Sequence, residues 1–187
     1  MDKHLHVISF DVPWPANYGG VIDVYYKIKA LAKLGVKVHL HCFEYGRGQQ
    51  SHLNEFCSEV HYYSRSKNPF LVLAKNPFIV QSRKNSDLLH RLLLDEAPIL
   101  FEGHHTCYYL DHPKLKHRTK LVRAHNVEHE YYIELAKAEK NSFKKWFFQI
   151  EGKKLRVIGI IEERGDLFVD SSILMPFDDI KELADQD

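Results

Sequence analysis

The chain has 187 residues, of which 44% are hydrophobic and 12% aromatic, and this size and composition suit one globular domain with a substantial core. Lysine and arginine number 26 against 25 aspartates and glutamates, whereas a domain that binds nucleic acid usually carries a basic excess. Three well-separated cysteines match neither a secreted disulfide framework nor a zinc knuckle, so a reducing compartment is expected.

The first elements have the pattern of a β-α-β unit. An apolar run at Leu5–Phe10 predicts a strand, and the prolines and glycines of Asp11–Gly20 predict a loop. Helical spacing of apolar residues over Val21–Leu34 predicts a helix that ends at Gly35. The next run, Val36–Phe43, alternates as a strand does. Its apolar face carries Val36, Val38, Leu40 and Cys42, and its polar face carries Lys37, His39 and His41.

The rest of the chain continues this alternation of strands and helices. Apolar runs predict strands at Val60–Tyr63, Ile99–Glu102 and Leu121–Ala124. Helical patterns predict helices at Ser86–Asp95, with Ser86 or Asp87 as its cap, at Glu128–Glu139 and at Ser142–Ile161. This order favours an α/β, Rossmann-like fold, in which a mostly parallel sheet of about six or seven strands has helices on both faces.

The first candidate site is the glycine pair Gly19 and Gly20, which follows a predicted strand and opens a helix. Ligands of open α/β sheets bind beyond the carboxyl ends of the strands. Backbone N–H groups at such glycines can approach a phosphate closely, and the helix dipole favours its negative charge. The alternative is a tight strand-to-helix turn that binds nothing.

The second candidate site is the segment Glu102–Tyr109, which follows another predicted strand. Glu102, His104 and Tyr108 are suited to hydrogen-bond sugar hydroxyls or to stack on a sugar ring. The alternative is a loop whose polar groups satisfy one another, with Thr106 as a helix cap.

The third candidate site is the segment that begins at Arg123, directly after the strand Leu121–Ala124. His125 is expected at the strand tip, and Asn126 is a good helix cap. A purely structural role for His125 is the plain alternative. His125 and His129 are also spaced as two metal ligands on one helix face, but they lack an adjacent glutamate and an obvious third ligand, so we expect no metal site.

Together the three segments resemble a known family. The pattern Pro-x-Pro-x-x-x-Gly-Gly at Pro13–Gly20, then Phe-Glu-Gly-x-His-Thr at Phe101–Thr106, then Arg-x-His-Asn-x-Glu at Arg123–Glu128, is similar to the N-terminal domain of family 4 retaining glycosyltransferases, over about residues 4 to 160. The resemblance implies one half of a GT-B architecture. In that architecture the N-terminal domain binds the acceptor, a saccharide or a lipid-linked molecule, and a second domain binds the sugar nucleotide.

The resemblance also assigns roles to individual residues. Gly19 and Gly20 would approach the donor diphosphate and the acceptor, and His125 would contact the transferred sugar near the reaction centre. The remaining candidates would line the site: Glu102, His104, Arg123, Asn126 and Glu128. The donor is a substrate, and no cofactor is implied. Because the chain lacks the Glu-x7-Glu pattern of the donor domain, we expect residues 1–187 to form a single acceptor-binding domain that is inactive alone.

The segment Phe143–Arg156 mixes basic and aromatic residues at helical spacing, as do helices that lie on an anionic membrane surface. The alternative is that the aromatic residues are core and the lysines are solvated. With no leader pattern and no apolar stretch near the ~20 residues that cross a bilayer, a cytoplasmic or inner-face location is expected. Two rival functions stay open: a non-catalytic carbohydrate- or partner-binding module, and a metal-dependent hydrolase that uses His125 and His129.

Overall fold

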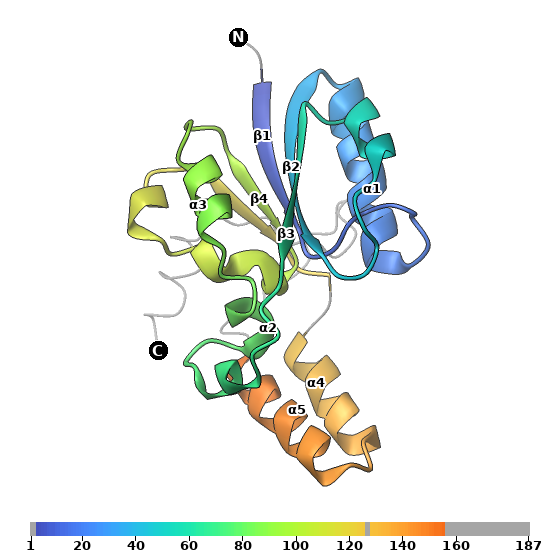
Figure 1. Ribbon diagram of the computed structural model, residues 1–187, viewed down its shortest axis with the longest axis vertical. Coiled ribbons are helices and arrows are strands. Elements are labelled where there is room, and N and C mark those ends of the chain that lie inside the picture. Colours follow the sequence, from blue (N-terminus) through green and yellow to red (C-terminus); the bar gives the residue numbers. More distant parts are fainter. Residues whose placement is uncertain (1–2, 126–127, 156–187) are drawn as a thin grey trace, which may run out of the picture.

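The computed structural model of the chain describes residues 3–125 and 128–155. Its centre is a sheet of five parallel strands in the order β3-β2-β1-β4-β5 (Figure 1). The strands are β1 Lys3–Ser9, β2 Val36–Glu44, β3 Glu59–Ser64, β4 Ile99–Glu102 and β5 Lys120–Arg123. All five strands predicted above are confirmed, as is the α/β fold. Any further strand in the tail falls outside the described residues.

Helices cover both faces of the sheet. The long helix α1, Gly19–Lys33, lies on one face, and α3, Ser86–Leu92, lies on the other (Figure 1). The remaining α-helices are α2 Phe78–Gln81, α4 Glu128–Ala138 and α5 Ser142–Lys154. Short 3₁₀ turns complete the fold: η1 Ser51–Glu55, η2 Pro69–Leu73, η3 His104–Tyr109 and η4 Pro113–Leu115.

The start of α3 differs from the sequence prediction. Its cap is Asn85, whose side chain accepts hydrogen bonds from the backbone N–H groups of Asp87 and Leu88 at 3.0 and 3.1 Å. The helix ends at Leu92, and Asp95 lies in the following turn, where it accepts a hydrogen bond from the backbone N–H of Ala97. α3 is therefore shorter than predicted, and this frees Asp95 to contact the sheet.

Alternation along the strands gives each face its own apolar core. The α1 face packs the buried residues Val7, Val24, Ile28, Val38, Leu40 and Leu100. The α3 face packs Ile8, Phe43, Leu88, Leu92, Ile99 and Phe101. The predicted apolar face of β2 is the face that meets α1. The polar face of β2 is the one that α3 covers.

The helices α4 and α5 pair as a hairpin beyond the carboxyl end of the sheet (Figure 1). Glu151 of α5, which is fully buried, accepts a hydrogen bond from the backbone N–H of Phe78 at the start of α2. Lys154 donates to the carbonyl oxygen of Val72 at 2.6 Å. These contacts fix the base of the hairpin against η2 and α2. No helix within the described ranges is long and apolar enough to cross a membrane.

Candidate functional site

The loop after β1 is held in a defined shape by its own polar side chains. Asp11 accepts hydrogen bonds from the Val12 backbone N–H at 2.8 Å and from the Tyr18 hydroxyl at 3.0 Å. Arg47 forms an ion pair with Asp11 and donates to the Pro15 carbonyl oxygen at 2.6 Å. These bonds set the direction in which the chain enters α1. The N-cap residue of α1, Tyr18, makes no side-chain hydrogen bond to the first-turn N–H groups.

The three motif segments meet around the ring of Phe10. A Cβ atom built on Gly20 would lie 2.6 Å from Phe10 Cζ, so this ring presses against the first turn of α1. Phe10 lies edge-on to His125, with ring centroids 5.4 Å apart. Gly103 has φ +74°, which favours glycine, and a Cβ there would lie 3.4 Å from His125 Cδ2. The loops after β1, β4 and β5 therefore converge at the carboxyl edge of the sheet.

Replacing Gly20 with alanine is expected to lower the free energy of unfolding by about 1–3 kcal/mol, because the new methyl group collides with Phe10. Gly19→Ala is the matched control. Nothing lies within 4 Å of a Cβ at Gly19, so this variant should be unchanged or slightly more stable. Urea denaturation of both variants is the measurement. Equal stabilities would contradict the close packing of Phe10 on Gly20.

Charged side chains from three elements surround His125. Lys27 of α1 donates to Glu102 Oε1 at 2.6 Å and to Asp23 Oδ2 at 3.1 Å. Arg123 Nε lies 2.9 Å from Asp23 Oδ2, and His125 Nε2 lies 3.1 Å from Glu102 Oε2. Two carboxylates are thus matched by two permanent cations, and the imidazole lies among them. We call these five residues the Asp23–His125 cluster.

This geometry assigns the proton on His125. A carboxylate only accepts hydrogen bonds, so the Nε2 atom that faces Glu102 carries the hydrogen. The other nitrogen, Nδ1, lies 3.7 Å from Asp23 Oδ2, which is longer than a hydrogen bond. In the neutral ring Nδ1 is therefore the nitrogen that can accept a hydrogen bond from a ligand hydroxyl.

Glu102 lies at the end of β4 as predicted, but its side chain is turned into the protein. Its side chain is 0% exposed, because β4 is an inner strand and Glu102 faces α1. The carboxylate is engaged by Lys27 and His125 and is not presented to a sugar hydroxyl. Its position instead suits it to hold the His125 ring and to fix which nitrogen carries the proton.

Only some of the other predicted site residues lie within the described part of the chain. His104 is half-buried, and burial, assisted by the neighbouring His125, lowers its pKa, so a neutral ring lies next to the Asp23–His125 cluster. Thr106 is not a helix cap, because its hydroxyl donates to the Gly103 carbonyl oxygen at 3.0 Å within η3. Asn126 and the side chains of Glu128 and His129 lie outside the described residues.

Three residues of the site were missed by the sequence analysis: Phe10, Asp23 and Lys27. Asp23 and Lys27 are four residues apart on α1, the spacing at which a helix pairs opposite charges, and this was an available signal. Their decisive partners, Glu102 and Arg123, lie far away in sequence. Phe10 was assigned to a strand, and nothing in its sequence context indicates that its ring closes the site.

The structure places two acids, Asp23 and Glu102, close to His125. Asp23, Glu102 and His125 each place one potential ligand atom within 4.8 Å of the others. However, Lys27 and Arg123 already neutralise these carboxylates. A divalent cation would have to displace both side chains, so the arrangement favours an ion-pair cluster over a metal centre.

Comparisons with known proteins give one relative of interest. The chain is 29% identical over 153 residues to a Klebsiella pneumoniae protein described as an uncharacterized 44.6 kDa protein in the cps region. The match spans 78% of this chain but only 39% of that protein. The chain matches no protein-family model, and no solved structure matches it.

Proposed function

We propose that this chain is the acceptor-binding half of a nucleotide-sugar-dependent glycosyltransferase. The observation that carries the proposal is the convergence of Gly20, Gly103 and His125 around Phe10, at the edge of a parallel sheet where such folds bind ligands. The relative in a cps region supports the same class of chemistry. We place the protein in the cytoplasm or at the inner face of a membrane.

The site offers groups that match the charges of glycosyl transfer. The reaction leaves negative charge on the departing diphosphate, and the first-turn N–H groups at Gly19 and Gly20 are a place to receive it. His125 Nδ1 would accept a hydrogen bond from a sugar hydroxyl. The partly exposed side chains of Asp23 and Arg123 would contact the acceptor. No covalent protein intermediate is required.

The proposal assigns donor binding to a second domain. This chain spans 39% of its relative, which leaves room in that protein for a domain of similar size. We further propose that the acceptor is a saccharide or a lipid-linked molecule. For a lipid-linked acceptor, α5 would bring the protein to the membrane that holds the lipid.

The test is a titration of the ¹⁵N-labelled chain with uridine and guanosine diphosphate sugars. We expect a dissociation constant in the millimolar range, on the order of −4 kcal/mol, because only backbone N–H groups at an open edge contact the diphosphate. The amide signals of Gly19, Gly20 and His125 should shift. Uridine, which lacks the diphosphate, is the control and should leave Gly19 and Gly20 unmoved.

The other outcomes decide between the rival functions. Micromolar binding or measurable sugar transfer by this chain alone would overturn its assignment as half an enzyme. Shifts at the same residues with free saccharides but not with nucleotide sugars would favour a non-catalytic carbohydrate-binding module. No shift at this edge with any of these ligands would contradict the proposed site.

A further inference from the structure

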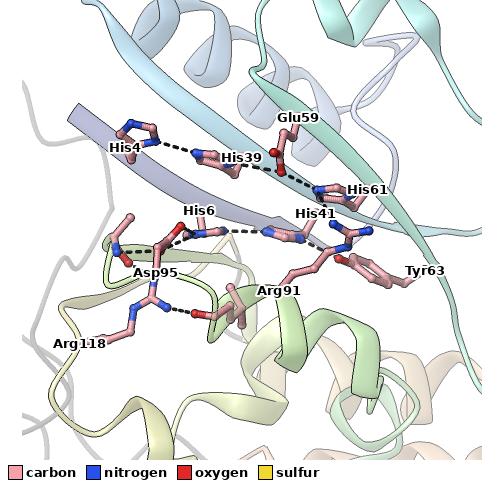
Figure 2. A network of polar contacts seen from close by, with 12 residues as sticks. His4, His6, His39, His41, Glu59, His61, Tyr63, Arg91, Asp95 and Arg118 are labelled. Carbon is pink, nitrogen blue, oxygen red and sulfur yellow. Dashed lines mark hydrogen bonds and ion pairs between the residues drawn. The ribbon is translucent and has the colours of Figure 1, made fainter. Parts of the chain in front are cut away.

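A row of five histidines lies on the α3 face of the sheet (Figure 2). They are His4 and His6 of β1, His39 and His41 of β2, and His61 of β3. Neighbouring rings stack with centroids 4.9 to 5.4 Å apart. None of these residues belongs to the Asp23–His125 cluster, which lies at the carboxyl edge. We call them the histidine row.

The inner two histidines form a continuous hydrogen-bonded chain with Tyr63 and Asp95 (Figure 2). The Tyr63 hydroxyl lies 2.8 Å from His41 Nδ1, and His41 Nε2 lies 2.9 Å from His6 Nδ1. His6 Nε2 lies 3.0 Å from the Asp95 carboxylate. His41 is 1% and His6 3% exposed, so water does not replace these bonds.

Asp95 sets the direction of the chain. Burial by itself raises the pKa of Asp95. The backbone N–H of Ala97, the His6 ring and the charge of Arg118 together outweigh burial and lower this pKa, so Asp95 is ionised and can only accept hydrogen bonds. His6 then donates from Nε2 and accepts at Nδ1. His41 must donate from Nε2 and accept the Tyr63 proton at Nδ1. In the neutral form of both rings the hydrogen is therefore on Nε2, and burial favours this form because it lowers the pKa of both histidines.

Added protons fit this chain poorly. A proton on His6 would place two N–H groups face to face unless His41 moved its hydrogen to Nδ1 and Tyr63 turned to accept it. A proton on His41 would leave a positive charge buried at 1% exposure. Two protons would create opposed donors between His6 and His41 that no rearrangement removes. Protonation of His6 and His41 at low pH therefore destabilises the contact between these strands and α3.

The charged and titratable groups around the inner pair come from every packed element. They are His4 from β1, His39 from β2, Glu59, His61 and Tyr63 from β3, Asp87 and Arg91 from α3, Asp95 from the turn after α3, and Arg118 from the turn before β5. Asp95 is the acid that contacts the inner pair. Arg118 also donates to the carbonyl oxygen of Leu92, which ties the end of α3 to the same point.

We propose that the histidine row is an acid-sensitive contact between the sheet and α3. The contact is intact when His6 and His41 are neutral, and it opens when they take up protons. Opening would release Asp95 and, with it, the end of α3. Arg118 contacts this end of the helix through the Leu92 carbonyl oxygen and through Asp95.

The direction of the pH dependence follows from the buried rings. Burial lowers the pKa of His41 well below its usual value, and the charges of His6 and His61 act the same way. Burial also lowers the pKa of His6, more than Asp95 raises it. The folded pKa is therefore below the unfolded value of about 6.5. The stabilisation is complete above about pH 6.5 and is lost as the pH falls, because unfolding then takes up protons.

The first test is a long-range ¹H–¹⁵N spectrum of the histidine-labelled chain at pH 7.5. His6→Gln and His41→Gln variants assign the two signals. We expect both rings to be neutral with the hydrogen on Nε2. A hydrogen on Nδ1 of either ring, or a charged ring at this pH, would overturn the proposal, and the wild-type spectrum decides this even where a variant folds poorly.

The second test is urea unfolding of the wild type between pH 7.5 and 5.5. Below about pH 6.5 the unfolding equilibrium constant should rise by up to about tenfold per pH unit for each buried histidine. His41→Gln should remove about half of that slope. His117→Gln, an exposed histidine outside the row, is the matched control and should keep it. The same slope in wild type and His41→Gln would also overturn the proposal.

Discussion

Lys27→Met is expected to destabilise the fold by about 3 kcal/mol, because it leaves the Glu102 carboxylate buried without its closest cation. Glu102 is fully buried, and its ion pair with Lys27 is 2.6 Å long. Removing one partner of a buried ion pair usually costs about 3–5 kcal/mol, and the lower value applies here since Lys27 is 21% exposed and water can reach the gap. Chemical denaturation measures the loss.

Lys33→Met is the matched control for this prediction. Lys33 lies in the last turn of the same helix, is exposed and should tolerate methionine. The double variant Lys27→Met with Glu102→Gln removes the unpaired charge and should recover much of the stability. If Lys27→Met were as stable as Lys33→Met, the Asp23–His125 cluster would not be held together as described.

Replacing Phe143 and Trp146 with serine is expected to weaken binding to vesicles that contain anionic lipid by about a hundredfold. Phe143 is 71% and Trp146 42% exposed, and their rings lie together with centroids 5.6 Å apart. Lys144 and Lys145 are exposed between them. Two aromatic side chains that enter the interface at about 1.5 kcal/mol each give this factor, and each lysine adds about 1 kcal/mol near an anionic surface.

Vesicle sedimentation separates this proposal from a general stickiness of exposed apolar groups. Phe70→Ser with Leu73→Ser removes two strongly exposed apolar residues from η2 and should leave binding unchanged. Vesicles of neutral lipid alone should bind the wild type weakly. Equal binding by the wild type and the Phe143 and Trp146 variant would refute membrane contact through α5.

The two faces of this helix explain why sequence patterns alone left its role open. Phe147 and Phe148 pack on the small core at Ile79 and Val80, as the core alternative requires. Phe143 and Trp146 stay exposed, as the surface alternative requires. The core alternative is confirmed for Phe147 and Phe148, and membrane contact through Phe143 and Trp146 stays a prediction. Which aromatic is covered depends on η2 and α2, far away in sequence.

The strands could be predicted because each alternates or runs apolar over its whole length, and burial on a sheet face imposes that pattern. The alternation also separated the two faces of β2 correctly. It could not show that the polar face is covered, so His41 offered no sign of its burial. Asp95 was assigned to a helix, whereas its bond to His6 depends on the chain turning earlier.

The sequence could predict which edge of the sheet holds the candidate site, but not the side-chain partners within it. Segments that follow parallel strands meet at one edge of the sheet, and Gly20, Gly103 and His125 do lie around Phe10 there. The partners of those residues are set by side-chain direction across α1 and β4. Because Glu102 points toward α1, a residue expected to touch ligand instead holds Lys27 and His125.

The Asp23–His125 cluster cancels its own charge, and this bears on how fast a ligand arrives. Lys27 and Arg123 carry two positive charges, and Asp23 and Glu102 carry two negative charges within the same few ångströms. Such a group has almost no field beyond the Debye length, so it neither attracts nor repels a diphosphate from a distance. Encounter with this edge is then governed by ordinary diffusion, and ionic strength changes the cluster's contribution to the association rate very little.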